Sequence, residues 1–146
     1  MRVDFYVLAE ASAAARLRVA CRIAEKAYLA SQTVLVWHTE RGELERLDEL
    51  LWTFADTSFV PHEWLGAAAP AGAEAPVLLG TAPPNAPVDV LINLDLSAEP
   101  PPFLAEVARV AEIIDGEPSR RDAGRARFKA YRQRGLSPDT HTLQAS

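Results

Sequence analysis

The sequence predicts a single α/β domain in which a mostly parallel sheet is flanked by helices, as in Rossmann-like proteins. Apolar, β-branched segments alternate with segments whose apolar residues recur at helical spacing, and this alternation is typical of a parallel sheet. One strand candidate, DVLINL (89–94), is a nearly continuous apolar run, as expected of a strand covered on both faces. A chain of 146 residues is long enough for one domain with a sizeable core.

The first part of the chain is expected to supply two strands and two helices. RVDFYVLA (2–9) is rich in β-branched and aromatic residues and predicts a buried strand. Ser12 is a suitable N-cap for a helix that runs to Ala30. TVLVWH (33–38) predicts a second strand, and ERGELERLDELLWTF (40–54) predicts a second helix with its leucines on one side.

The second part of the chain is expected to complete the sheet. ARVAEII (108–114) is compatible with a strand or a short helix, and we favour the strand because its apolar residues precede the turn residues Asp115 and Gly116. Segments rich in proline, alanine and glycine predict loops, since proline cannot serve a sheet interior. These loops are 66–76, 81–87 and 98–102.

A basic helix is expected near the C-terminus, over RRDAGRARFKAYRQRG (120–135). Ser119 is a candidate N-cap, and Gly135 is a suitable stop signal. The residues that follow, 137–146, predict an extended tail, which leaves 1–136 as the folded domain.

Composition and charge restrict the class of protein. The formal net charge is −5, and the lone cysteine, Cys21, has no partner for an internal disulfide, which suits a reducing compartment. The chain begins without a basic-then-apolar leader, and no run approaches the roughly 18 apolar residues of a membrane span. We therefore expect a cytoplasmic protein that does not contact a membrane.

The residues required for the chemistry of common α/β enzymes are missing from the expected positions. The first strand is followed by LAEASAA rather than by a glycine-rich, lysine-containing loop that could hold a polyphosphate. His38, His62 and His141 are not spaced as metal ligands, and no serine lies in a nucleophile elbow. Asp89 and Asp95 flank a strand, where aspartate commonly forms turns. We expect no catalytic site, cofactor or metal, and a nucleotide-binding enzyme of the same fold remains the alternative.

The basic helix is the strongest candidate for a binding site. Residues 120–146 carry 7 Lys/Arg against 2 Asp/Glu, whereas residues 1–119 carry 8 against 18. If this segment is a helix with 100° per residue, three arginines and one phenylalanine fall in a stripe about 60° wide along one side of it. The stripe consists of Arg121, Arg125, Phe128 and Arg132, and Lys129 lies at its border. The small residues Ala123, Ala126 and Ala130 are expected to pack on the sheet.

Three interpretations of this stripe are open. Guanidinium groups bind carboxylates in a fork, and the ring supplies an apolar seat, so an acidic peptide with an apolar end fits best. Single-stranded nucleic acid with a base stacked on Phe128 is the rival ligand. A merely solvated charged face is the third interpretation, although such a face normally mixes the two signs of charge.

Four motifs together resemble the chi subunit of the bacterial DNA polymerase III holoenzyme, an accessory of its clamp loader. The motifs are DFYVL (4–8), RLDELLWTFADTSFVPH (46–62), DVLINL (89–94) and GRARFKAYRQRGL (124–136). The second and the fourth motif, found together and in this order, are specific for the family. The resemblance implies a non-catalytic α/β fold, similar to a nucleotide-binding domain without its phosphate loop. It implies that DNA is contacted only indirectly, in support of DNA replication.

The resemblance also implies two protein partners. The first is single-stranded DNA-binding protein, whose acidic C-terminal tail ends in phenylalanine. Its implied seat consists of Arg121, Arg125, Phe128, Lys129 and Arg132, with Ile114 as an apolar wall. The second is psi, the small subunit that joins chi to the clamp loader where an organism has one. The implied psi surface lies in LLWTFADTSFVPH (50–62), with Trp52, Phe59 and Val60 as contacts.

Overall fold

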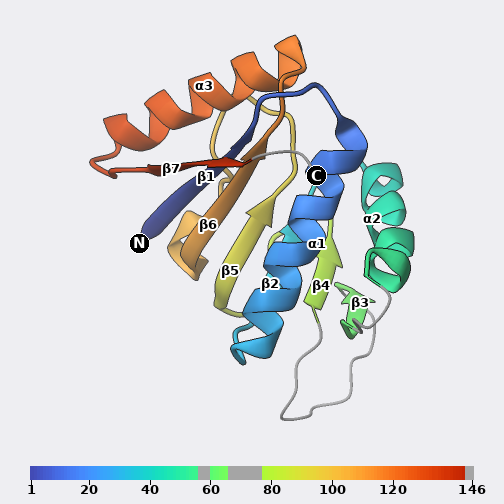
Figure 1. The fold of residues 1–146 in the computed structure, drawn as a ribbon. Coiled ribbons are helices and arrows are strands. Elements are labelled where there is room, and N and C mark those ends of the chain that lie inside the picture. The colour runs from blue at the N-terminus through green and yellow to red at the C-terminus, as the bar shows by residue number, and fades with distance from the viewer. Residues whose placement is uncertain (56–59, 66–76, 144–146) are drawn as a thin grey trace.

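The computed structural model describes residues 1–55, 60–65 and 77–143, and in them a seven-stranded parallel sheet is flanked by helices (Figure 1). In chain order the elements are β1 (Arg2–Leu8), α1 (Ala13–Leu29), β2 (Val34–Trp37), α2 (Arg41–Thr53), β3 (His62–Trp64), β4 (Val77–Gly80), β5 (Val88–Asn93), the 3-10 helix η1 (Leu104–Glu106), β6 (Val107–Ile114), α3 (Pro118–Gln133) and β7 (Asp139–Leu143). The strands lie in the order β3-β4-β2-β5-β6-β1-β7, and every neighbouring pair is parallel. The predicted α/β fold class is confirmed.

The elements expected in the first part of the chain are all present. Ser12 caps α1 as predicted, because its side-chain oxygen accepts a hydrogen bond from the backbone N–H of Ala15 at 3.1 Å. Ser31, just beyond the end of α1, has a positive φ of 61°, which turns the chain toward β2. The favoured strand at 108–114 is also confirmed, as β6.

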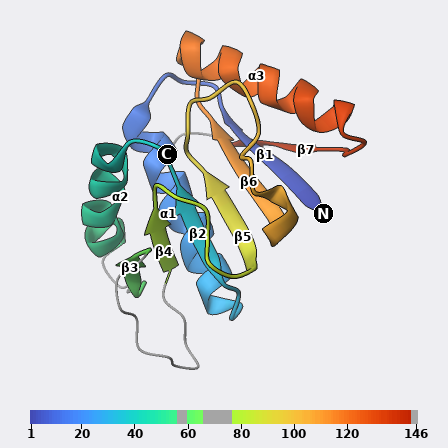
Figure 2. The ribbon, with the colours of Figure 1, turned by 180° about the vertical axis from the view of Figure 1, so that it is seen from behind.

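Two hydrophobic cores lie on opposite faces of the sheet. α1 and α2 cover one face, and α3 with η1 covers the other, as the two opposite views show (Figures 1 and 2). Strand alternation divides the side chains: Val36 and Ile92 belong to the first core, whereas Leu35 and Leu91 belong to the second. No helix among the described residues has both the length and the apolar character that crossing a bilayer requires.

The sheet is wider than the sequence indicates. β7 lies within the segment expected to be an extended tail, and it pairs in parallel with β1 as an edge strand. His141 secures it, since its Nε2 lies 2.8 Å from a carboxylate oxygen of Asp4 and its ring stacks on Tyr6 at 5.0 Å. The short strands β3 and β4 were not predicted either. Of the expected loops, 81–87 and 98–102 are confirmed, and 66–76 lies outside the described residues.

The start of α3 differs from the prediction. Glu117, not Ser119, is the N-cap: its side chain accepts hydrogen bonds from the backbone N–H groups of Ser119 and Arg120. Pro118 follows at the first helical position, where a missing N–H has no cost. Gly135 has a φ of +84° just beyond the helix, and it ends the helix as predicted.

Candidate peptide-binding groove on α3

The face of α3 that packs on the sheet is not the predicted alanine face. Its buried residues are Gly124, Arg127 and Tyr131, whereas Ala126 is exposed and Ala123 and Ala130 are half-buried. The prediction that the three alanines form the packing face was wrong. The large side chains of Arg127 and Tyr131 can be buried between α3 and the sheet, because the sheet supplies a partner for their polar atoms.

That partner is Glu112 on β6, which lies at the centre of a buried polar network. Arg127 Nε donates to Glu112 Oε1 at 3.0 Å, and its Nη1 donates to the carbonyl of Ser97 at 2.6 Å. Tyr131 and Asn93 both donate to Glu112 Oε2, at 2.8 and 2.9 Å. Burial, and then the charge of Glu112, raise the pKa of Tyr131, so its hydroxyl stays protonated and donates. The network holds α3 in one rotation about its axis.

A second ion pair holds the start of α3. Arg120 donates to both carboxylate oxygens of Asp115, at 2.7 and 2.6 Å, and Asp115 also accepts the backbone N–H of Ser12 at 2.9 Å. Burial acts to raise the pKa of Asp115, but the hydrogen bond and charge of Arg120 outweigh it, and the pKa is lowered. Arg120 and Arg127 therefore serve the fold, although both belong to the basic segment.

The basic residues of the predicted stripe, unlike Arg120 and Arg127, line a groove along α3. Its first hollow has a volume of about 200 Å³ and lies between the helix and the β1–β7 edge of the sheet. The lining consists of Phe5, Val7, Ile114, Arg121, Gly124, Arg125, Phe128 and Thr140. A second hollow of about 360 Å³ is lined by Phe128, Lys129, Arg132 and Gln133. We refer to the two hollows together as the α3 groove.

All six residues expected to hold a peptide line the α3 groove. Ile114, Arg121 and Arg125 border the first hollow, Lys129 and Arg132 border the second, and Phe128 borders both. Phe128 is half-buried rather than fully exposed, because its ring packs edge-on against Phe5 with centroids 5.1 Å apart. Its ring is therefore held in place as an apolar wall between the hollows.

The groove is strongly positive and has an apolar floor. Arg121, Arg125, Lys129 and Arg132 are exposed, and none of them forms an ion pair with another described residue. The floor is made by Ile114, which is 6% exposed, and by the backbone of α3. Among the described residues that line it there is no carboxylate, thiol or imidazole, and such a lining suits an anion with an apolar part. Within the described ranges no three His, Cys, Asp or Glu side chains are grouped to hold a metal ion.

Sequence reasoning missed five residues that line the groove, which are Phe5, Val7, Gly124, Gln133 and Thr140. Gly124 lies where any Cβ would collide with the side chain of Ile114, so it allows α3 to approach β6 closely. A glycine in a helix interior is a detectable signal, because it costs about 1 kcal/mol relative to alanine. Phe5 and Thr140 had no such signal, since their contribution depends on the positions of β1 and β7 in the sheet.

The residues expected to contact psi lie apart from the groove, near the end of α2. Trp52 is 56% exposed, and its ring centroid lies 4.7 Å from that of His62. Val60 is only 1% exposed and belongs to the core beneath α1 and α2. Phe59 lies outside the described residues. Figure 1 shows α2 and α3 on different sides of the molecule, so the two predicted sites do not meet.

The fold and the groove together define a class: a parallel α/β protein with a basic groove, apolar at its floor, along α3. Residues 1–139 match the family described as "DNA polymerase III chi subunit, HolC". The chain is 43% identical over 143 residues to DNA polymerase III subunit chi of Pseudomonas aeruginosa, and this match covers 97% of this chain and 96% of that protein. It is 30% identical over 125 residues to DNA polymerase III subunit chi of Escherichia coli, a match that covers 86% of this chain and 84% of that protein.

The chain belongs to the chi subunit family of DNA polymerase III, which confirms the resemblance seen in its four motifs. An accessory role in DNA replication follows from that membership.

Proposed function

We propose that this chain tethers the clamp-loader complex to DNA coated with single-stranded DNA-binding protein, by binding that protein's acidic C-terminal tail in the α3 groove. One observation carries the proposal. The six residues expected from the sequence border two neighbouring hollows that share Phe128, and the exposed cations there form no ion pair with another described residue. An acidic peptide would supply the missing negative charge.

The two hollows suggest how the tail is oriented. The first hollow has an apolar floor at Ile114 and Gly124 and a wall at Phe128, so it suits the terminal apolar side chain of the tail. Arg121 and Arg125 lie at the same hollow, where their guanidinium groups can form a fork with the terminal carboxylate.

The second hollow suits the acidic residues that precede the end of the tail. It is more open to solvent, and the ammonium of Lys129 and the guanidinium of Arg132 lie on its border. Ion pairs at such exposed positions contribute little individually and weaken with salt. The first hollow is therefore expected to supply most of the affinity, and the second to supply charge complementarity.

The link to the clamp loader is assigned to the end of α2. Trp52 offers a large exposed aromatic surface, and exposed aromatic residues commonly anchor protein interfaces. Val60 packs inward, so in this conformation Trp52 is the contact that the described residues support. Because α2 and α3 are separate, the psi partner and the tail can be bound together (Figure 2).

A nucleotide-binding function is less well supported. In parallel α/β proteins a phosphate is commonly bound by backbone N–H groups where the helix after the first strand begins. Here the carboxylate of Asp115 accepts the N–H of Ser12 at that position, and its negative charge disfavours a phosphate. Direct binding of single-stranded DNA would need a base stacked on Phe128, and the contact with Phe5 leaves only part of that half-buried ring accessible.

Fluorescence anisotropy tests the proposal directly. A labelled peptide with the tail sequence is titrated with the full chain, beside the same peptide lacking its last residues and a C-terminal amide form. We expect the complete peptide to bind, the truncated one not to bind, and the amide to bind more weakly because the fork loses its carboxylate. Equal affinity for all three peptides would contradict the proposal, and binding of an unrelated oligonucleotide with a steep salt dependence would favour the DNA alternative.

A further inference from the structure

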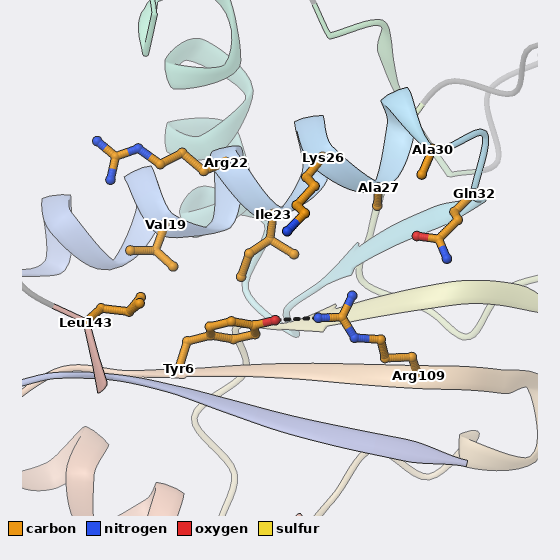
Figure 3. Close-up of a pocket in the computed structure, with 10 residues that line it drawn as sticks. All are labelled: Tyr6, Val19, Arg22, Ile23, Lys26, Ala27, Ala30, Gln32, Arg109 and Leu143. Carbon is orange, nitrogen blue, oxygen red and sulfur yellow. Dashed lines mark hydrogen bonds between the residues drawn. The ribbon is translucent and has the colours of Figure 1, made fainter. Parts of the chain in front are cut away.

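A separate pocket lies on the opposite face of the sheet, between α1 and the strands at the β1–β7 edge (Figure 3). It exists because α1 lies over the middle of the sheet, so that no described helix covers β1 and β7 on this face (Figure 1). Its volume is about 380 Å³. Small-molecule sites typically have volumes of roughly 300–1,000 Å³, so this pocket has the size of a small ligand.

The walls of this pocket are apolar and fixed in place. From α1, Val19 and Ile23 point toward the sheet, and Tyr6 of β1 lies opposite Ile23 (Figure 3). The Tyr6 ring is stacked on His141 and its hydroxyl accepts a hydrogen bond from Arg109, so it cannot easily swing into the pocket. An apolar ligand would therefore enter a preformed slot.

Positive charge is concentrated at the same pocket. Arg22, Lys26 and Arg109 line it, and no acidic residue does in the part of the chain that the structure describes, although residues 1–119 hold only 8 Lys/Arg against 18 Asp/Glu. Arg109 is paired with Asp4 at 2.8 Å, but Arg22 and Lys26 form no ion pair with a described residue. The lining of the pocket is therefore basic, within a part of the chain that carries more acidic than basic residues.

Three polar groups line this pocket. In Figure 3 the ammonium of Lys26 points from α1 toward the sheet, the guanidinium of Arg109 lies next to the Tyr6 hydroxyl on the sheet side, and the amide of Gln32 lies at the Ala30 end. Arg109 retains N–H groups beyond its bonds to Asp4 and Tyr6, because a guanidinium carries five. An ammonium on the helix side of the pocket and a guanidinium on its sheet side are suited to a carboxylate.

We propose that this pocket binds a small amphipathic carboxylate. Its apolar body lies between Ile23 and Tyr6, and its carboxylate lies between Lys26 and Arg109. Such a group can come from a free carboxylic acid or from the C-terminal residue of a peptide, since both present one carboxylate on an apolar body. The site is independent of the α3 groove, because the sheet separates the two.

Heteronuclear NMR of the full chain, titrated with octanoate, tests this site. We expect saturable shifts at Ile23, Ala27 and Leu143, and weaker or no shifts with neutral octanamide. Lys26→Glu should weaken octanoate binding by at least about tenfold, because a charge-assisted hydrogen bond is replaced by repulsion. Arg18→Glu is the matched control: it makes the same charge change on α1 at a position that does not line the pocket, and it should leave the affinity nearly unchanged.

Further arms separate the two sources of the carboxylate and the two sites. An N-terminally blocked dipeptide that ends in leucine with a free carboxylate is compared with its C-terminal amide. If the free-carboxylate dipeptide binds more tightly than octanoate, the natural ligand carboxylate is that of a peptide terminus. Octanoate binding that persists in Arg125→Ala supports a site separate from the α3 groove. The proposal is overturned if octanoate shifts no pocket residue, or if Lys26→Glu and Arg18→Glu bind it equally.

Discussion

Arg127 of α3 and Glu112 of β6 form an ion pair inside the protein: Nε and Oε1 lie 3.0 Å apart, and the two side chains are 1% and 0% exposed. The pair joins the middle of the helix to the middle of the sheet. It determines which side of α3 faces inward, and therefore places Arg121, Arg125 and Phe128 on the groove. The proposed binding surface for an acidic ligand thus depends on a buried arginine that does not line it.

Arg127→Met is expected to destabilise the protein strongly. It keeps most of the side-chain volume but leaves the buried charge of Glu112 without its cation, which typically costs about 3–5 kcal/mol. Urea denaturation measures the free energy of unfolding. Arg125→Met is the matched control, because it makes the same change at an exposed position and should alter stability by no more than about 0.5 kcal/mol.

The double variant Glu112→Gln with Arg127→Met separates a charge effect from a packing effect. Glutamine removes the unpaired charge but keeps an oxygen that can accept from Tyr131 and Asn93, so the double variant should be more stable than Arg127→Met alone. A double variant that is no more stable would contradict this account, and packing would then explain the loss.

Arg125→Ala is expected to weaken binding of the tail peptide by roughly 1.5–3 kcal/mol, the range for hydrogen bonds to charged groups. Phe128→Ala should weaken it comparably through lost apolar contact. Only Phe128→Ala should also lower the free energy of unfolding, because its ring packs on Phe5. Anisotropy against salt concentration should show that part of the wild-type affinity survives high salt.

Arg134→Ala is the control for these two variants, since Arg134 is exposed at the C-cap of α3 and does not line the groove. If all three variants bound the peptide as the wild type does, the basic stripe would be a solvated face.

Gly124→Ala should destabilise the protein even though alanine favours helices. The new Cβ would collide with Cδ1 of Ile114, and overpacking of about 1–3 kcal/mol exceeds the gain of about 1 kcal/mol in helix propensity. Ile114→Val removes the colliding atom, so the same glycine change should cost less in that background. Thermal unfolding of the two single variants and the double variant measures these differences in stability. If Gly124→Ala were more stable than the wild type, the side chain of Ile114 would be able to move aside at little cost, and the prediction would be wrong.

Trp52→Ala is expected to weaken binding of psi by at least about 2 kcal/mol while leaving affinity for the tail peptide unchanged. The melting temperature should change little, because 56% of Trp52 is exposed. Leu29→Ala removes another exposed apolar side chain, 73% exposed on α1, and should affect neither partner. Unfolding of Trp52→Ala, or loss of tail binding, would place Trp52 in the fold rather than at the psi interface.

Most helices and strands could be predicted from short-range patterns in the sequence. Ser12 before an apolar helical pattern, and the continuous apolar run of β5, act over a few residues and are visible without knowledge of the rest of the chain. β7 was not visible in this way, because DTHTL has little apolar character. It is a strand because β1 offers a free edge, and because His141 meets the buried carboxylate of Asp4.

The sequence by itself determined which residues of α3 share a side, since the helical period places Arg121, Arg125 and Phe128 in one stripe wherever the helix lies. Only the tertiary structure decided which side is buried. Burying Arg127 is favourable only where a carboxylate lies opposite, and Glu112 reaches that point because β6 is placed beside β1 in the sheet. Strand order depends on contacts between distant parts of the chain, so the partner of a buried charge cannot be identified from local spacing.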